Sequence, residues 1–164
     1  MRNPELIPAK IASLPALLDK IAQWRSSNKT IAFTNGCFDI LHIGHIASLS
    51  EAAAEADVLI VGMNSDASTK RLKGPERPVN HEHSRALLMA SLAIVDAVVI
   101  FEEDTPENLI KAILPDVLVK GGDYTIENIV GAKEVIANGG RVVINPIVAG
   151  FSTTGIIEKI RSLG

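Results

Sequence analysis

Short apolar runs alternate with segments of helical periodicity from residue 29 to the C-terminus. The helical segments fall within residues 44–56, 82–95, 105–114, 126–140 and 152–163. The apolar runs have the length and the Ile and Val content of buried strands, and they span residues 29–35, 57–64, 96–102, 115–121 and 141–146. This alternation predicts right-handed βαβ units in an α/β fold, which is a Rossmann-like open parallel sheet of five strands with helices on both faces.

The first 29 residues precede this alternation. Residues 1–10 contain two prolines and indicate an irregular lead-in. Residues 13–28 predict a helix, with Ser13 as a candidate cap and Pro15 in its first turn. We therefore predict two parts: an N-terminal lead-in and helix over residues 1–29, and a domain over residues 30–164.

Composition narrows the class of protein. Of the 164 residues only 4% are aromatic, so the core must be built from Ala, Ile, Leu and Val, which favours parallel strands covered by helices. The net charge of −3 argues against general nucleic-acid binding. A lone cysteine, Cys37, allows neither an internal disulfide nor a zinc ligand set. No signal peptide or membrane-spanning run is present, so the cytoplasm is the expected location and no membrane partner is expected.

Polar residues gather just after the predicted strands. In open parallel sheets, ligands bind beyond the carboxyl ends of the strands, at the switch point. The segments that follow the strands begin "NGCFDILHIGH", "NSDASTKRLKG", "EEDTP", "KGGDY" and "VAGFSTT", and four of the five are rich in Gly, His, Lys, Ser, Thr or Asp. The candidate chemistry is therefore expected at one rim of the sheet.

The first of these segments, "TNGCFDILHIGH", joins the first strand to the first helix of the alternation. Gly44 allows a phosphate to approach the backbone at a helix N-terminus, where free N–H groups favour anions. His42 and His45 are three residues apart and can project to the same side. The chain has neither a P-loop nor a dinucleotide fingerprint, so the two histidines indicate a phosphate clamp of another kind. The alternative is that one histidine caps the helix and the other packs in the core.

A local positive cluster follows the second strand. It could hold an anionic substrate in a chain of net negative charge, although charge runs also occur as ordinary solvated loops. Its members are Lys70, Arg71, Lys73, Arg77 and Arg85, with His81 and His83 among them.

The segment "GCFDILHIGH" resembles the signature of the H-x-G-H nucleotidyltransferase superfamily. Further blocks are similar to the adenylyltransferases of ADP-heptose synthesis, from about Thr30 to the C-terminus. They read "NSDASTKRLKGPERPVN", "FEEDTPENLI", "ILPDVLVKGGDY", "GAKEVIANGG" and "GFSTTGIIEKI". The chain departs from that pattern at "NHEHSR" and at Phe151, where a small or polar residue is expected.

The resemblance implies an enzyme that transfers AMP from ATP to D-glycero-D-manno-heptose 1-phosphate, releasing pyrophosphate and giving ADP-heptose for cell-surface polysaccharide. It also implies a separate heptose kinase, because no kinase domain precedes the match. A homodimer is expected, with Leu and Trp residues of the N-terminal helix at the contact.

Two alternative functions remain open: a cytidylyltransferase that uses CTP and glycerol 3-phosphate, and a non-catalytic nucleotide-binding module. A class I aminoacyl-tRNA synthetase also carries H-I-G-H, but the short chain, the lack of the second lysine-rich signature and the lack of a basic tRNA-binding surface argue against it.

The resemblance also implies roles for individual residues. His42 and His45 would hold the triphosphate, and Lys73, in a mobile loop, would neutralise charge that builds up between the substrates. The residues expected to bind the nucleotide are Cys37, Phe38, Gly44, Gly121, Asp123, Tyr124, Ser152, Thr153 and Thr154. For Asp123 and the three hydroxyl residues the alternative is ordinary helix capping, and for Cys37 it is a small buried residue.

The sugar phosphate would be bound by Asp39, Arg77 and Arg85, since a guanidinium fork matches phosphate oxygens. Asp39 could instead orient a neighbour, and Arg85 could pair with Glu82 on the surface. Mg²⁺ is expected to arrive with ATP. No cluster of acidic residues in the sequence resembles a dedicated metal site.

Overall fold

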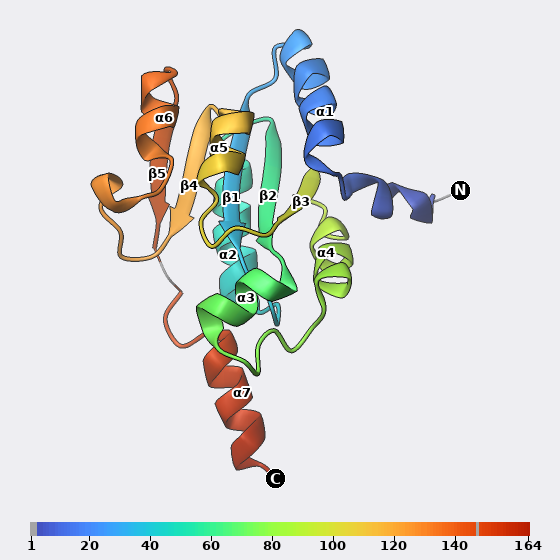
Figure 1. The fold of residues 1–164 in the computed structure, drawn as a ribbon, viewed down its shortest axis with the longest axis vertical. Coiled ribbons are helices and arrows are strands. Elements are labelled where there is room, and N and C mark those ends of the chain that lie inside the picture. The colour runs from blue at the N-terminus through green and yellow to red at the C-terminus, as the bar shows by residue number, and fades with distance from the viewer. Residues whose placement is uncertain (1–2, 147) are drawn as a thin grey trace.

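The computed structural model describes residues 3–146 and 148–164. A parallel sheet of five strands forms its centre, in the order β3–β2–β1–β4–β5 (Figure 1). The strands are β1 Ile31–Gly36, β2 Val58–Asn64, β3 Ala97–Phe101, β4 Val117–Gly121 and β5 Arg141–Asn145. All four pairings are parallel, which confirms the predicted fold class.

The strand order changes direction between β1 and β4. β2 and β3 continue the sheet on one side of β1, and β4 and β5 continue it on the other. β1 pairs with β2 along its whole length but with β4 at only two positions, Ala32–Val117 and Phe33–Leu118. Beyond Phe33 and Leu118 the two strands run on without pairing. This is the topological switch point, where ligands bind in open α/β sheets.

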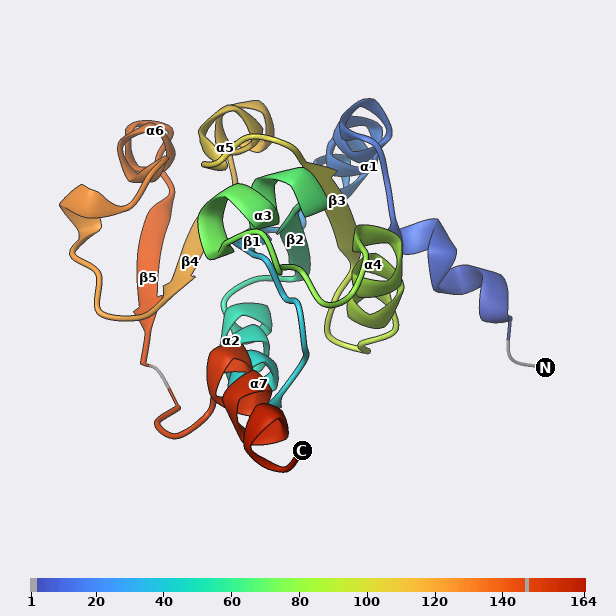
Figure 2. The ribbon, with the colours of Figure 1, turned by 60° about the horizontal axis from the view of Figure 1, so that its bottom comes forward.

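Helices cover both faces of the sheet, as Figure 2 shows. On one face, α1 (Leu14–Ser26), α5 (Glu107–Ile113) and α6 (Ala132–Ala137) contribute to one apolar core. On the other face, α2 (Ile43–Ala54) and α4 (Glu82–Ala90) contribute to a second core. The strands separate the two cores, and β1 to β4 are mostly buried, in keeping with their continuous apolar sequence, whereas the edge strand β5 is only partly buried.

Helix α1 packs on the sheet. Leu17 and Ile21 are buried in the core of their face, and Leu14, Leu18 and Trp24 pack against it. The Leu and Trp residues that we expected at a dimer contact therefore pack within the protomer itself. The homodimer remains a prediction, but these residues no longer support it. The lead-in before α1 forms two 3-10 turns, Pro4–Leu6 and Pro8–Lys10, and bridges to the edge strand β3 at Ile11 and Val98.

Four elements differ from the sequence prediction. The helix predicted over residues 82–95 ends at Ala90. The residues after β2 form helix α3 (Asp66–Lys73) rather than a loop. The helix predicted over residues 126–140 is split into a 3-10 turn, Ile126–Asn128, and α6, because Ile129 is extended after the turn and Gly131, with a φ of +83°, is the N-cap of α6. The cap of α5 is Pro106, one residue later than predicted, and no side chain bonds to the free N–H groups there.

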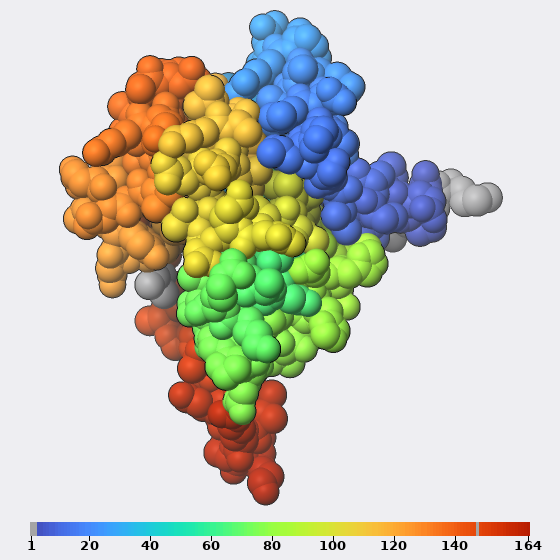
Figure 3. All heavy atoms as spheres, viewed as in Figure 1, coloured from blue at the N-terminus to red at the C-terminus, as the bar shows by residue number. Residues whose placement is uncertain are grey.

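The last helix, α7 (Thr153–Ser162), lies beyond the carboxyl ends of the strands and projects from the body of the molecule (Figure 3). None of its residues is buried. Among the helices that the structure describes, none is both long enough and apolar enough to cross a bilayer.

Candidate active site

His42 and His45 lie together at the start of α2. His42 is the N-cap and His45 is in the first turn, so one helical turn brings the two rings into a stack with their centroids 3.9 Å apart. Phe38 meets the His45 ring edge-on at 5.3 Å between centroids. Gly44 is required for this arrangement, since a Cβ there would lie 3.0 Å from the Nδ1 and Cε1 atoms of His42.

Each of the two imidazoles has one ring nitrogen for which no described residue supplies a hydrogen-bond partner. The Nδ1 atoms of His42 and His45 are both buried and lack a partner among the described residues. Burial lowers the pKa of His42, and burial together with the charge of His42 lowers the pKa of His45 to about 4. Both rings are therefore neutral at pH 7. A buried polar atom without a partner is costly, so the pair is suited to an anionic ligand at the helix N-terminus.

Two small clefts adjoin the histidines. One, of about 250 Å³, is bounded by His45 together with the β1–α2 loop and the end of β4. The other, of about 180 Å³, is bounded by both histidines, Gly44 and Phe151. Gly121 lines both clefts, and a Cβ there would lie 3.1 Å from Ser48 Oγ. The predicted residues Cys37, Phe38 and Tyr124 line the larger cleft, so the structure brings these together with the histidines.

The residues at the start of α7 are partly committed to structure. Ser152 caps the helix by accepting a hydrogen bond from the Gly155 amide at 3.0 Å, and Thr153 Oγ1 donates to the carbonyl oxygen of Ile40 at 3.3 Å. Thr154 instead lines a separate cleft of about 420 Å³ with Lys73 and Arg77. The predicted Asp123 is exposed and lines none of these clefts.

Lys73 is the last residue of α3, not part of a mobile loop as predicted. Its side chain borders the 420 Å³ cleft and also a cleft of about 350 Å³ above the switch point. This second cleft shares Cys37 and Tyr124 with the 250 Å³ cleft beside His45. The helix thus places a lysine at the same rim as the histidines, from the opposite side of the opening between β1 and β4.

Arg85 has a different position from the one we predicted. It is 1% exposed, and its guanidinium donates to the carbonyl oxygens of Asn80, Cys37 and Asn64 and to Asp66 Oδ1, the last at 2.7 Å. The prediction that Arg85 binds the sugar phosphate is corrected, because these bonds use its donors inside the protein. Arg85 instead links the segments that follow β1 and β2 by hydrogen bonds.

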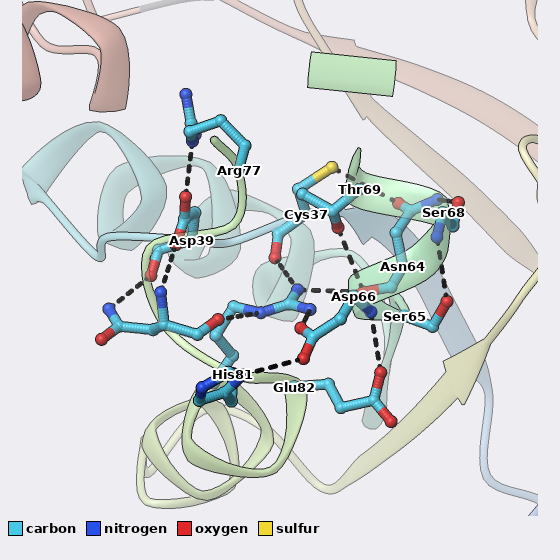
Figure 4. Close-up of polar contacts among 12 residues, drawn as sticks. Cys37, Asp39, Asn64, Ser65, Asp66, Ser68, Thr69, Arg77, His81 and Glu82 are labelled. Atoms are coloured by element: carbon cyan, nitrogen blue, oxygen red, sulfur yellow. Dashed lines mark hydrogen bonds and ion pairs between the residues drawn. The ribbon is translucent and has the colours of Figure 1, made fainter. Parts of the chain in front are cut away.

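Asp39 is also internal. The residue is 2% exposed, and its carboxylate accepts hydrogen bonds from the backbone amides of Val79 and Asn80. It also accepts one from Arg77 Nε at 2.6 Å (Figure 4). Burial acts to raise the pKa of Asp39, but the hydrogen bonds from Asn80, Val79 and Arg77 outweigh it and lower the pKa. The predicted contact with sugar phosphate is therefore corrected: Asp39 orients Arg77 and the loop that carries it.

The predicted positive cluster does not form one anion site. Arg71 pairs with Asp104, Arg77 with Asp39, and both Arg85 and His81 pair with Asp66. Within the described residues, no three His, Cys, Asp or Glu side chains are grouped to hold a metal ion.

Sequence reasoning missed three residues of the site: Asn35, Ser48 and Lys120. Lys120 and Asn35 line both the 350 Å³ and the 250 Å³ clefts, and Ser48 lines the two clefts beside the histidines. A signal existed for each. Asn35 and Lys120 are polar residues near the ends of buried strands, and Ser48 is one turn after His45 on α2.

A family model described as cytidylyltransferase-like matches residues 33–159, which include the histidine pair, the ends of β1 and β4, and most of α7. The chain belongs to the cytidylyltransferase-like family. This confirms the resemblance to nucleotidyltransferases that the H-x-G-H segment indicated. The match lies within the domain predicted over residues 30–164.

Curated relatives of this member of the cytidylyltransferase-like family are longer proteins. The chain is 58% identical over 142 residues to the bifunctional protein HldE of Mesorhizobium japonicum, covering 87% of this chain and 29% of that one. It is 54% identical over 151 residues to the bifunctional protein HldE of Hyphomonas neptunium, covering 92% and 31%. The chain therefore spans less than a third of the length of these relatives.

Solved structures agree with the fold. The crystal structure of a lipopolysaccharide core biosynthesis protein from Thermoplasma volcanium has a TM-score of 0.58 and 29% identity, and covers 73% of this chain and 97% of its own. A pantoate-beta-alanine ligase from Francisella tularensis, at 16% identity, has a TM-score of 0.56 and covers 92% and 76%. The ligase supports the fold alone.

Proposed function

We propose that this chain is an adenylyltransferase that joins ATP to D-glycero-D-manno-heptose 1-phosphate and releases pyrophosphate, giving ADP-heptose. The observation that carries the reaction class is the stacked pair His42 and His45. Their unpartnered Nδ1 atoms lie at a helix N-terminus, beside clefts that continue across the switch point to Lys73. MgATP is the proposed nucleotide substrate, and the ion arrives with it.

The reaction needs no base from the protein. A phosphate monoester has its second pKa near 6, so the sugar phosphate is mostly a dianion at pH 7. One of its oxygens attacks the α-phosphorus of ATP in line, the new P–O bond forms, and the bond to the bridging oxygen of the β-phosphate breaks, so that the electron pair leaves with pyrophosphate. The protein supplies positioning and stabilisation of the developing charge. His42 and His45 are the proposed donors to the triphosphate.

The choice of substrates rests on similarity more than on chemistry. The blocks similar to adenylyltransferases of ADP-heptose synthesis, the identity to HldE proteins and the likeness to a lipopolysaccharide core biosynthesis protein all support the heptose. A kinase that supplies the heptose 1-phosphate and a homodimer remain predictions. The glycerol 3-phosphate cytidylyltransferase is the alternative, because the same histidine pair would serve CTP.

A panel of substrates tests the proposal. The protein is incubated with Mg²⁺, with ATP or CTP, and with heptose 1-phosphate or glycerol 3-phosphate, and pyrophosphate release is measured. We expect release with ATP and heptose 1-phosphate. We also expect a preference for ATP over CTP of tens to hundreds of fold, since a pyrimidine in place of adenine would leave hydrogen-bonding groups of the protein unpaired at about 1–3 kcal/mol each. Release only with CTP and glycerol 3-phosphate would replace the adenylyltransferase by the cytidylyltransferase. Binding of nucleotide without turnover would indicate a non-catalytic module.

Lys73 is expected to act on the transition state more than on ATP binding. It borders the 350 Å³ cleft but neither of the two clefts beside the histidines, and it forms no ion pair with a described residue. Lys73→Ala should lower kcat by about tenfold to a hundredfold, the value of a hydrogen bond to a charged group, and change the KM for ATP much less. Steady-state kinetics in both substrates measures the split. Lys70→Ala, an exposed lysine one turn earlier on α3, is the matched control, and a pure KM effect for ATP contradicts this role.

A further inference from the structure

Lys120 is a charged residue in an unusual place. It lies near the carboxyl end of β4, half-buried, where β1 and β4 no longer pair. Its Nζ atom donates a hydrogen bond to Asn35 Oδ1 at 3.1 Å and lies 5.7 Å from the centre of the Tyr124 ring. The side chain therefore spans the opening of the switch point from one strand to the other.

The lysine has no counter-ion among the described residues. None of the ion pairs in the described part of the chain includes Lys120 or Lys73. The acidic residue in the same cleft, Asp104, is paired with Arg71 at 2.7 Å. Burial lowers the pKa of Lys120; the neighbouring Cys37 acts to raise the pKa, and the positive charge of Lys73 acts to lower it. A part-buried ammonium group such as that of Lys120 is unfavourable unless an anion neutralises it, whereas Lys73 is exposed to solvent.

The cleft between the two lysines has the dimensions of a ligand site. Its volume of about 350 Å³ is within the range of small-molecule pockets. Lys73 enters it from α3 and Lys120 from β4, and Asn35 and Asn128 add amide groups. Polar side chains of Asn64, Asp104 and Thr105 also line the cleft, and an apolar part of its wall is formed by Leu72, Pro106, Leu118, Ile129 and Val130.

We propose that this cleft binds the phosphate group of the acceptor substrate, a sugar phosphate monoester, between Lys120 and Lys73. The identity of the ligand rests on the proposed function. That the cleft binds an anion is inferred from the structure alone, because neither lysine has a carboxylate partner among the described residues. A dianionic phosphate would supply the charge that the cleft lacks. The neighbouring cleft beside His45 shares Asn35, Cys37, Lys120 and Tyr124, so an acceptor held here lies next to the triphosphate site, as in-line attack requires.

This site replaces the one that the sequence predicted for the sugar phosphate. Arg85 is internal, and Arg77 gives its Nε to Asp39. Neither arginine borders the 350 Å³ cleft. Lys120, by contrast, touches the cleft for the acceptor and the one beside the histidines, which makes it a binding residue placed where the two substrates would meet.

Binding experiments on Lys120→Met test the proposal without relying on turnover. Titration calorimetry is carried out with heptose 1-phosphate, with glycerol 3-phosphate in a second arm, and with MgATP separately. We expect Lys120→Met to weaken binding of the sugar phosphate by about tenfold to a hundredfold and to change MgATP affinity by less than about threefold. Lys120→Arg, which keeps the charge, should recover most of the affinity. Lys133→Met removes an exposed lysine of α6 and should behave like the unchanged protein.

The outcomes separate this proposal from the proposed function. If Lys120→Met, folded as judged by its thermal midpoint, binds both phosphate monoesters as well as the unchanged protein does, the phosphate site is wrong even if ADP-heptose is formed. An equal loss of MgATP affinity overturns it too, because Lys120 would then serve the nucleotide. If glycerol 3-phosphate is bound in a Lys120-dependent way and no ADP-heptose is formed, the site stands and the adenylyltransferase assignment fails. Failure of the unchanged protein to bind either monoester overturns the site.

Discussion

Replacing His42 or His45 with alanine is expected to lower turnover by on the order of a hundredfold or more. A donor aimed at charge that develops in the transition state contributes roughly 3–4 kcal/mol. Both rings are neutral at pH 7, have buried Nδ1 atoms without a partner among the described residues, and stack at 3.9 Å between centroids. The measurement is kcat for pyrophosphate release with saturating MgATP and heptose 1-phosphate.

The fold of these variants should be retained, because both histidines lie at the rim and are not part of either apolar core. His83→Ala is the matched control: His83 is an exposed histidine on α4 and should keep full turnover. A variant of either His42 or His45 that folds normally and turns over near the native rate would remove the phosphate clamp from the mechanism.

The strands were predictable because most of them are buried on both faces; the edge strand β5 is only partly buried but still reads as a short apolar run. Such strands read as short continuous apolar runs, and the runs at β2 and β3 match the observed elements to within about one residue. The histidine pair was predictable for a similar reason, since H-x-G-H is local and one helical turn brings the two rings together. Local sequence patterns therefore predicted the parallel sheet, the α/β fold class and the histidine pair of the site.

Helix α3 was not predictable from apolar periodicity. Its buried residues are Ser68 and Thr69, and its start is fixed by Ser65, whose Oγ accepts from the Ser68 amide at 3.1 Å. A helix that is held by polar contacts lacks the apolar stripe that marks a surface helix. Lys73 was therefore assigned to a loop, although the structure places it at the end of that helix.

The partners of the charged residues depend on the tertiary fold. Arg85 and Asp66 are separated by 19 positions, and Lys120 and Asn35 by 85. The sequence contains the charges but not their pairing. The buried Arg85 was therefore assigned to a ligand, and Lys120, which forms no ion pair with a described residue, was overlooked. Whether an arginine is internal or free for a phosphate depends on carbonyl groups and carboxylates supplied by other elements.

Arg85→Met is expected to lower the free energy of unfolding by about 3 kcal/mol, the low end of the range for breaking a buried ion pair. The low end applies because the Asp66 side chain remains 32% exposed, while that of Arg85 is fully buried. The substitution also leaves the carbonyl oxygens of Asn80, Cys37 and Asn64 without this donor. For a chain of this size the thermal midpoint should fall by roughly 6–12 °C, and urea unfolding should show a lower midpoint with an unchanged slope.

Arg71→Met provides the control for this prediction. Arg71 pairs with Asp104 at 2.7 Å, the same N–O distance as between Arg85 and Asp66, but its side chain and that of Asp104 are 50% and 54% exposed. An exposed pair contributes at most about 1 kcal/mol, so Arg71→Met should shift the midpoint far less. Because Arg85 holds the segments after β1 and β2 together from inside, Arg85→Met should also lose turnover at temperatures where it is still folded. Equal destabilisation by the two variants would mean that burial of the Arg85 network does not set its contribution to stability.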